Sequence, residues 1–452
     1  KFPGWRFESI YRMLEGDAGG NSTGLVMTSR GTGLRNPGVN ACFVNVALQC
    51  FLRVEAVSRL ITAHLNIHDQ PDGCCVACAL GRLTLAFRSA GSSEVRKSST
   101  AVLEHVRLGL FDPDMASQRV GGRILHPQCD AAELLLGTGS LKGFLQVLNT
   151  WEDEVGGVPE RDEYGARRHA LSELVCCSIT STRLLCRQCN GVSDRLERAM
   201  HLDLHVGGAG GRHARDLLAL LDDYFSEYSS EGMRCPKACG FHGPDHVRAQ
   251  RFLEKEPSVL FLRLNRMDLD GSKNNAPVRF PKVLTFLRSG PYHFASVIRH
   301  SGDSCNSGHY VATCWRGGAE YTVYNDGDLT DVTWREVAAE QTQREAYVLI
   351  YVRARFWEGA ARDGTEETPY ERDEASKAAA QRRPLDDLAV ASKASAAGPA
   401  APVAPEVGRS EEAVGPPARG QKRVQQAPGK EAGAEPRRSA RIRARTERAN
   451  LK

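Results

Sequence analysis

The chain has 452 residues, of which 41% are hydrophobic, and its 59 basic residues nearly balance its 55 acidic residues. This balance gives no chain-wide signature of nucleic-acid binding, and without any run of about 18 apolar residues we expect no membrane span. Residues 1–17 lack a continuous apolar core, which argues against a signal peptide. The fourteen cysteines are not needed as a disulfide framework in a chain of this length, so we expect a reducing compartment, the cytoplasm or the nucleus.

The predicted elements change from helices to strands along the chain. From Cys42 to Val57, apolar residues recur at spacings of three and four, which predicts one helix with a single apolar face. Further helices are expected at 129–137 and 144–155. Short runs rich in apolar, β-branched and aromatic residues predict strands at 196–206, 258–267, 292–300, 308–315, 320–326 and 345–353. Helices followed by antiparallel strands predict an α+β fold.

The composition divides the chain into three parts. Residues 31–353 carry the periodicity and short turns of a globular region, and residues 1–30 precede it as an N-terminal extension. From residue 354 the chain is highly charged and then rich in alanine, proline and glycine. Such a segment cannot bury enough apolar surface to offset its ordering entropy, so we expect 354–452 to be disordered. Its basic end, PRRSARIRARTERANLK, fits a solvated tail, a nuclear import signal or a contact with nucleic acid.

Cys42 lies where the glycine-containing segment GLRNPGVNA meets the apolar stretch CFVNVALQCFL. At a helix start, backbone N–H groups and the helix dipole stabilise a thiolate, and the same donors can bind an oxyanion. The pattern also fits an inert buried thiol. A nucleophilic cysteine additionally needs a positioned histidine.

His309 is the best candidate for that histidine. The segments HYVATCW and EYTVYND alternate like strands, and RGGA between them predicts a hairpin. A turn centred on Gly317 and Gly318 places His309 opposite Asp326, or opposite Asn325 if the register differs by one. Such a neighbour fixes the tautomer of the imidazole and stabilises its charged form.

Two short cysteine pairs predict a metal site. Cys186 and Cys189 are separated by two residues, and Cys235 and Cys239 by three. Two thiolate pairs on separate turns suit one tetrahedral structural zinc ion. His242 or His246 is the alternative to Cys239. A further group in GCCVACAL, at 73–80, lacks a second pair and does not predict a metal site.

Five segments, in this order, resemble the ubiquitin-specific protease family of deubiquitinases. They are GLRNPGVNACFVNVALQC, PQCDAAELL, VLFLRLNRM, NNAPVRFPKVLTF and GHYVATCW with YTVYND. Together they cover the whole globular part, residues 31–353, and five segments in the family's order are far more specific than one.

The resemblance implies a papain-like fold with a helical thumb, a β-rich palm and zinc-tipped β fingers at about 175–255. Ubiquitin and ubiquitinated proteins would be the partners, and the bond after the C-terminal glycine of ubiquitin would be cut through a thioester on Cys42. His309 would take the thiol proton and later protonate the leaving amine. Asn325 matches the third triad position, and the adjacent Asp326 is a candidate assistant. The chemistry needs no cofactor.

Asp130 and Glu133 match acids that, in the family, face the arginines of the ubiquitin tail. Their spacing of three residues would place both on one face of a helix, where carboxylates can pair with arginines. A solvated helix face is the alternative interpretation.

The first segment departs from the family pattern. The family's oxyanion donor is an asparagine five residues before the nucleophile, but Asn36 lies six before Cys42, as if Val39 were inserted. The resemblance therefore carries two hypotheses, an active thiol isopeptidase or a catalytically weak ubiquitin-binding scaffold of the same fold.

Overall fold

The computed structural model describes the globular region in segments. They are residues 31–36, 40–65, 75–89, 92–108, 116–120, 123–126, 129–137, 143–144, 175–207, 215–229, 233–240, 246–268, 272–287, 290–304 and 307–354. The N-terminal extension, nearly all of the helix expected at 144–155 and the tail from residue 355 lie outside these segments. Among the described helices, none is long and apolar enough to cross a membrane.

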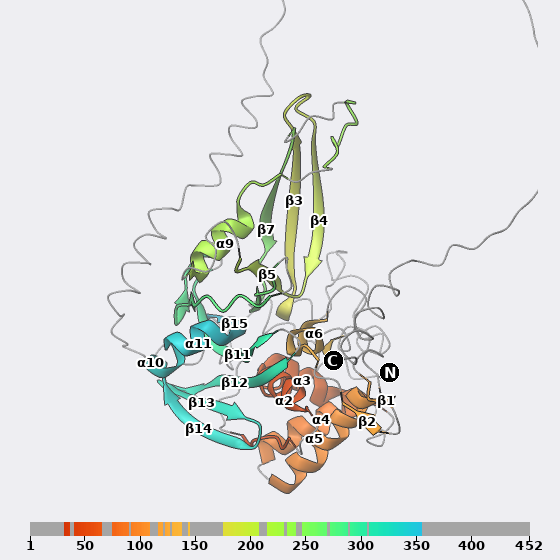
Figure 1. The fold of residues 1–452 in the computed structure, drawn as a ribbon, viewed down its shortest axis with the longest axis vertical. Coiled ribbons are helices and arrows are strands. Elements are labelled where there is room, and N and C mark those ends of the chain that lie inside the picture. The colour runs from red at the N-terminus through yellow and green to blue at the C-terminus, as the bar shows by residue number, and fades with distance from the viewer. Residues whose placement is uncertain are drawn as a thin grey trace, which may run out of the picture. The chain divides into compact units, whose positions relative to one another are not determined.

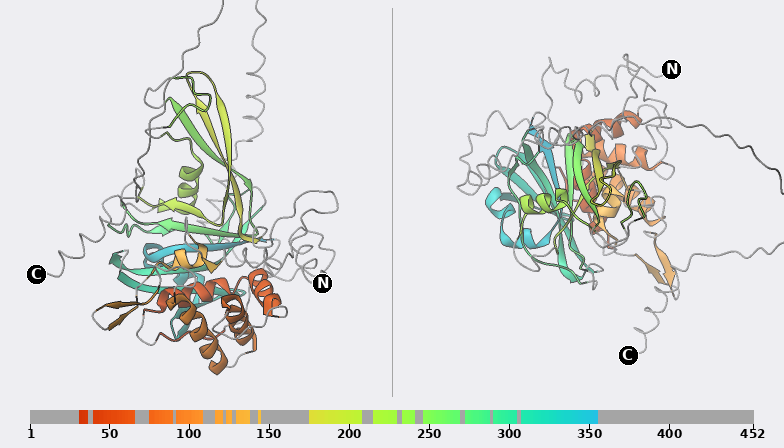
Figure 2. Two further views of the ribbon diagram at one scale, coloured as in Figure 1. Left: turned by 90° about the vertical axis from the view of Figure 1, so that its right-hand side faces the viewer. Right: turned by 90° about the horizontal axis from the view of Figure 1, so that it is seen from above.

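The N-terminal half of the described chain is helical. The helices are α2 (Cys42–Phe51), α3 (Glu55–Leu65), α4 (Val76–Ser89), α5 (Ser92–Arg107) and α6 (Ala131–Leu136). In sequence order, α3 packs on α4 and α4 on α5, while α2 packs on α6. Figure 2 shows these helices together on one side of the strands described below.

The helix expected to run from Cys42 to Val57 is two helices. It ends at Phe51, and α3 begins at Glu55. Between them Arg53 is buried, donates a hydrogen bond to the hydroxyl of Tyr324 and lies 4.7 Å from the centre of that ring. Because this long-range contact fixes Arg53, the chain turns here and the helix ends. All ten residues of α2 are buried, so the helix is covered on every side instead of presenting one apolar face.

An eight-stranded sheet follows, in the order β14-β13-β12-β11-β15-β8-β5, with β10 (Val283–Leu284) paired to β11. The strands are β5 (Leu202–His205), β8 (Val259–Asn265), β11 (Tyr292–Ser304), β12 (Ser307–Gly317), β13 (Glu320–Asn325), β14 (Asp328–Thr333) and β15 (Ala346–Arg353). All pairs are antiparallel except β5 with β8. The strands expected at 258–267, 292–300, 308–315, 320–326 and 345–353 are therefore confirmed, and so is the α+β class.

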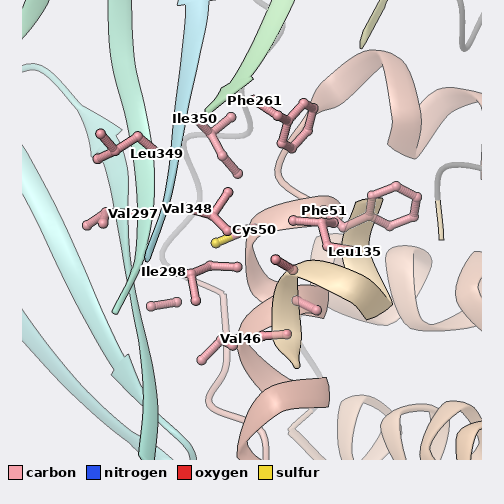
Figure 3. Packing of buried hydrophobic residues seen from close by; sticks show 14 of the residues in the cluster. Val46, Cys50, Phe51, Leu135, Phe261, Val297, Ile298, Val348, Leu349 and Ile350 are labelled. Atoms are coloured by element: carbon pink, nitrogen blue, oxygen red, sulfur yellow. The ribbon is translucent and has the colours of Figure 1, made fainter. Parts of the chain in front are cut away.

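The main core lies between this sheet and helices α2 and α6 (Figure 3). Val46 and Cys50 of α2 lie toward the strands, whereas the ring of Phe51 points away from them, and Leu135 of α6 belongs to the same core. On the strand side the core includes Phe261, Val297, Ile298, Val348, Leu349 and Ile350. Consecutive residues of β11 and β15 are buried, so these strands are covered on both faces. Their continuous apolar runs explain why the sequence predicts them so clearly.

A second sheet of three strands, ordered β4-β3-β7, projects from the rest of the described chain (Figure 1). It consists of β3 (Ser178–Cys186), β4 (Val192–Ala199) and β7 (Val247–Lys255). The single strand expected at 196–206 is divided between β4 here and β5 of the large sheet, with a bend at Met200 and His201. The alternation of apolar residues continues across the bend, which is why the sequence shows no break.

The remaining described elements are short. They are the hairpin of β1 (Gln118–Val120) and β2 (Arg123–Leu125), the parallel pair β6 (Arg215–Asp216) and β9 (Val278–Arg279), and the helices α9 (Leu217–Phe225), α10 (Trp334–Val337) and α11 (Glu340–Glu345).

One buried arginine joins several of these elements. Arg266 directly follows β8, is only 2% exposed, and donates hydrogen bonds of 2.6–3.0 Å to four backbone carbonyl oxygens, those of Asn274, Ala276, Gln343 and Ala346. Burial lowers the pKa of Arg266 to about 10. The guanidinium thus provides hydrogen-bond donors for the buried backbone carbonyl oxygens where β8, α11 and β15 meet.

We predict that Arg266→Met lowers the free energy of unfolding by about 3–5 kcal/mol, because it leaves several buried carbonyls without donors. Arg195→Met is the control, since that side chain is 78% exposed and its ion pair with Glu197 is worth less than about 1 kcal/mol. Urea unfolding of both variants measures the difference. Equal midpoints would show that Arg266 does not hold these elements together.

Candidate functional site

Cys42 begins α2 and is buried against the large sheet. The residue is 3% exposed, and Ala41 precedes it as the N-cap without a side-chain cap. Burial raises the pKa of the Cys42 thiol, a hydrogen bond with the backbone of Tyr310 opposes that rise, and the charge of Asp326 adds to it. Because Tyr310 directly follows His309, this contact places Cys42 beside the strand that carries the histidine.

His309 and Asn325 form a hydrogen bond between β12 and the end of β13. The Nε2 of His309 lies 2.6 Å from Oδ1 of Asn325. An amide oxygen only accepts, so Nε2 carries the proton and Nδ1 is left with its lone pair. The Oδ2 of Asp326 is 4.0 Å from the same Nε2. The histidine side chain is 42% exposed, which leaves room for a ligand next to it.

The hairpin register differs from the predicted one by one residue. Ala312 pairs with Tyr324, and extending that register by three residues on each strand sets His309 opposite Gly327, not Asp326 or Asn325. The turn is centred one residue later than predicted, since Gly317 pairs with Glu320, and the irregularity between Trp315 and Gly317 takes back part of the resulting shift. A shift of one residue exchanges the two faces of a strand, so Asn325 becomes the diagonal neighbour of His309 on the same face.

Asp326 joins three segments at this point. Its φ of 51° is in the left-handed region, and its backbone carbonyl accepts a hydrogen bond from the N–H of Leu34 at 2.8 Å. Its two carboxylate oxygens accept from Nδ2 of Asn45 at 2.7 Å and from Nδ2 of Asn36 at 3.1 Å. Asn45, one of the two amides that α2 carries with Gln49, was missed by sequence reasoning. Its isolation among apolar neighbours was the available signal.

Asn36 lies at the start of α2. Its Oδ1 accepts a hydrogen bond from the N–H of Ala41 at 3.3 Å, while its Nδ2 donates to Asp326. The amide is thus held beside the residue that precedes Cys42. Residues 37–39, including the apparent insertion at Val39, lie outside the described segments.

Asp130 has partners within the chain, and it does not lie within the helix as expected. It is the N-cap of α6, where Oδ1 accepts from the N–H of Ala132 at 2.7 Å. Its Oδ2 forms an ion pair with Arg263 at 2.9 Å and accepts a hydrogen bond from the hydroxyl of Tyr347. Glu133 lies in the first turn of the helix. Both acids therefore lie at the start of α6, Asp130 as its N-cap with extended backbone geometry and Glu133 three residues later.

The four predicted zinc ligands come together at the far end of the three-stranded sheet. The sulfur atoms of Cys186 and Cys239 are 3.8 Å apart, those of Cys189 and Cys235 are 3.5 Å apart, and all four lie within 4.8 Å of one another. Tetrahedral zinc with bonds of about 2.3 Å would separate its sulfur ligands by about 3.8 Å. Cys239 therefore occupies the position for which histidines were the alternative. Of these, His242 lies outside the described segments.

The backbone around this cluster also suits a metal thiolate. The N–H of Lys237 lies 3.3 Å from the sulfur of Cys235. Hydrogen bonds from the backbone of Cys239 and of Lys237 lower the pKa of Cys235 to about 6. A thiolate stabilised in this way is the form that binds metal.

Known proteins are similar to this chain in sequence and in fold. The family model described as ubiquitin carboxyl-terminal hydrolase matches residues 32–351. Human ubiquitin carboxyl-terminal hydrolase 42 is 24% identical over 349 residues, which cover 72% of this chain and 23% of that protein. Mouse ubiquitin carboxyl-terminal hydrolase 17-like protein D is 25% identical over 337 residues, covering 71% and 54%. The chain thus spans only part of the length of these relatives.

Solved structures agree on the fold. A chain of the SAGA DUB module Ubp8/Sgf11/Sus1/Sgf73 bound to monoubiquitin matches with a TM-score of 0.56 and 20% identity, over 76% of this chain and 74% of that one. The same module bound to ubiquitin aldehyde matches with a TM-score of 0.54 and 20% identity, over 71% and 69%. The ubiquitin-specific protease fold expected from the sequence is confirmed. With most of its globular region matched by the family model, the chain belongs to the ubiquitin carboxyl-terminal hydrolase family, as a ubiquitin-specific protease.

Proposed function

We propose that the chain is a thiol-dependent deubiquitinase that hydrolyses the isopeptide or peptide bond after the C-terminal glycine of ubiquitin. The observation that carries this proposal is the pairing of His309 with Asn325 next to Cys42. His309 has the tautomer of a general base, with the lone pair on Nδ1. Cys42 forms a hydrogen bond with the backbone of Tyr310, the residue after His309. Ubiquitin bound to the structural relatives supports the choice of substrate.

In this mechanism the reaction begins with a neutral thiol. Because burial raises the pKa of Cys42, its proton must be removed as the sulfur attacks, and Nδ1 of His309 is the acceptor. Asn325 holds the ring in the required tautomer and orientation. The sulfur adds to the carbonyl carbon of the terminal glycine, and His309 then protonates the leaving amine. Water, deprotonated by the same histidine, hydrolyses the thioester and releases ubiquitin.

Asn36 is the proposed oxyanion donor. Its hydrogen bonds with Ala41 and Asp326 fix the orientation of the side-chain amide at the start of α2, where backbone N–H groups also gather. Developing negative charge on the glycine carbonyl oxygen would be stabilised there. One structural zinc ion at Cys186, Cys189, Cys235 and Cys239 would secure the end of the three-stranded sheet, away from the chemistry.

We predict that Cys42→Ala abolishes hydrolysis of a fluorogenic amide of the ubiquitin C-terminus, because no other group can form the thioester. Asn36→Ala should lower kcat by about 10²–10³, the usual loss for one oxyanion donor. Binding of ubiquitin is measured in parallel for each variant. A folded wild-type chain that binds ubiquitin without any hydrolysis would favour the alternative, a ubiquitin-binding scaffold.

We predict that Asp326→Asn lowers the pH at which Cys42 is half-maximally reactive toward iodoacetamide. The negative charge of Asp326 raises the pKa of the thiol, so its removal must lower that pKa. Alkylation of the Cys42 peptide is followed by mass spectrometry across the pH range. Asp328→Asn, an exposed neutralisation two residues away, is the control and should leave the midpoint unchanged. An unchanged or higher midpoint in Asp326→Asn would contradict the assigned electrostatics.

Both Asp130 and Glu133 are proposed to face the arginines of the ubiquitin tail, and Asp130 also forms an ion pair with Arg263 and accepts a hydrogen bond from Tyr347. We predict that Glu133→Gln raises KM about tenfold with little change in kcat, since one charge-assisted contact is lost. Asp130→Asn should instead lower the thermal midpoint, because it breaks the internal ion pair. The control is Glu94→Gln, an exposed acid of α5. Equal effects of Glu133→Gln and Glu94→Gln on KM would exclude the contact.

A further inference from the structure

A second group of metal-binding side chains lies where α3 ends and α4 begins. His64 is in the last turn of α3, Cys75 directly precedes α4, and Cys78 is in its first turn. The Nε2 of His64 is 3.4 Å from the sulfur of Cys75 and 3.3 Å from that of Cys78. All three donor atoms lie within 4.8 Å of one another. The sequence shows no second pair near these cysteines because the third donor comes from the preceding helix.

The packing of the two helices fixes this arrangement. A Cβ atom added to Gly81 would lie 2.6 Å from Cγ of Leu65 and 3.1 Å from the carbonyl oxygen of Ile61. Glycine at this position therefore lets α4 approach the end of α3 at backbone distance. His64 lies next to Leu65, and Cys78 is one turn before Gly81, so the close approach also brings the donors together.

The distances between donors fit a zinc ion. With bonds of about 2.3 Å to sulfur and about 2.0 Å to nitrogen, a tetrahedral ion would separate a cysteine sulfur from a histidine nitrogen by about 3.5 Å. The observed distances, 3.4 and 3.3 Å, are close to this value. A hydrogen bond alone explains the cluster less well, because Nε2 offers either one proton or one lone pair and two sulfurs converge on it. Neither Cys75 nor Cys78 is part of a disulfide.

Charge and burial support the same assignment. Two thiolates and a neutral imidazole make a zinc centre with no net charge, which can be buried at low cost. His64 and Cys78 are 3% and 0% exposed, while Cys75 is only partly buried and provides a route to solvent. The four-cysteine cluster would carry two negative charges with zinc, and there Cys189 and Cys239 are exposed.

We propose that His64, Cys75 and Cys78 bind a second structural zinc ion, which clamps the end of α3 to the start of α4. A water molecule or a further residue completes its coordination. The site is independent of the proposed activity, and it stabilises the helices that follow α2, the helix of Cys42.

The test is the zinc content of the purified full-length chain, measured by inductively coupled plasma mass spectrometry. We expect two zinc ions per chain in the wild type and one in His64→Ala or Cys78→Ser. His64→Cys should keep two, because a thiolate can replace the imidazole. Cys129→Ser, a partly buried cysteine in neither cluster, is the matched control and should also keep two.

A second variant keeps the test decisive if the His64 and Cys78 variants fail to fold. The double variant Cys189→Ser/Cys235→Ser removes the four-cysteine site and should retain one zinc ion. Replacing that ion with cobalt(II) should give the visible bands and sulfur-to-metal absorption of tetrahedral thiolate coordination. The proposal is overturned by one zinc ion in the wild type that this double variant loses, by two ions in His64→Ala, or by a Cys75–Cys78 disulfide in the purified chain.

Discussion

The site depends on one residue, Asp326, which joins segments from opposite ends of the globular region. Its carboxylate accepts hydrogen bonds from Asn36 and Asn45, and its backbone carbonyl accepts one from Leu34. These contacts fix the start of α2 relative to the end of β13. The arrangement has an electrostatic cost, because the same carboxylate disfavours the thiolate of Cys42. Positioning and reactivity thus make opposite demands on one charge, and in the proposed mechanism His309 compensates by taking the thiol proton.

Strands β8, β11 and β15 could be predicted from the sequence because they are buried on both faces and appear as uninterrupted apolar runs, whereas the alternation of apolar residues indicated β12 and β13. What could not be predicted were the places where a distant contact overrides the local pattern. The helix from Cys42 stops because Arg53 reaches Tyr324, which is 271 residues away in the sequence. The hairpin register differs for a local reason, because the turn is centred one residue later than the sequence RGGA suggests and an irregularity lies between Trp315 and Gly317.

The candidate site shows the same division. Cys42, His309 and Asn325 could be chosen because they lie in contiguous segments with a family pattern, and the two cysteine pairs because their spacing is short. Asn45, the internal ion pair of Asp130 with Arg263, and the approach of His64 to two cysteines depend on the packing of separate elements. The spacing of residues along the sequence does not indicate such packing. The sequence therefore predicts which residues take part in chemistry better than it predicts which residues hold them in place.

The complete burial of α2 has a consequence for how the chain is made. The helix is covered partly by β11 and β12, and the residue that secures its start, Asp326, lies 290 residues after Asn36. During synthesis the apolar surface of α2 therefore emerges long before the strands that cover it, and it is prone to association in that interval. For the same reason Cys42 and His309 can meet only when almost the whole globular region has left the ribosome. If the proposed mechanism holds, a nascent chain cannot hydrolyse its substrate until this fold is complete.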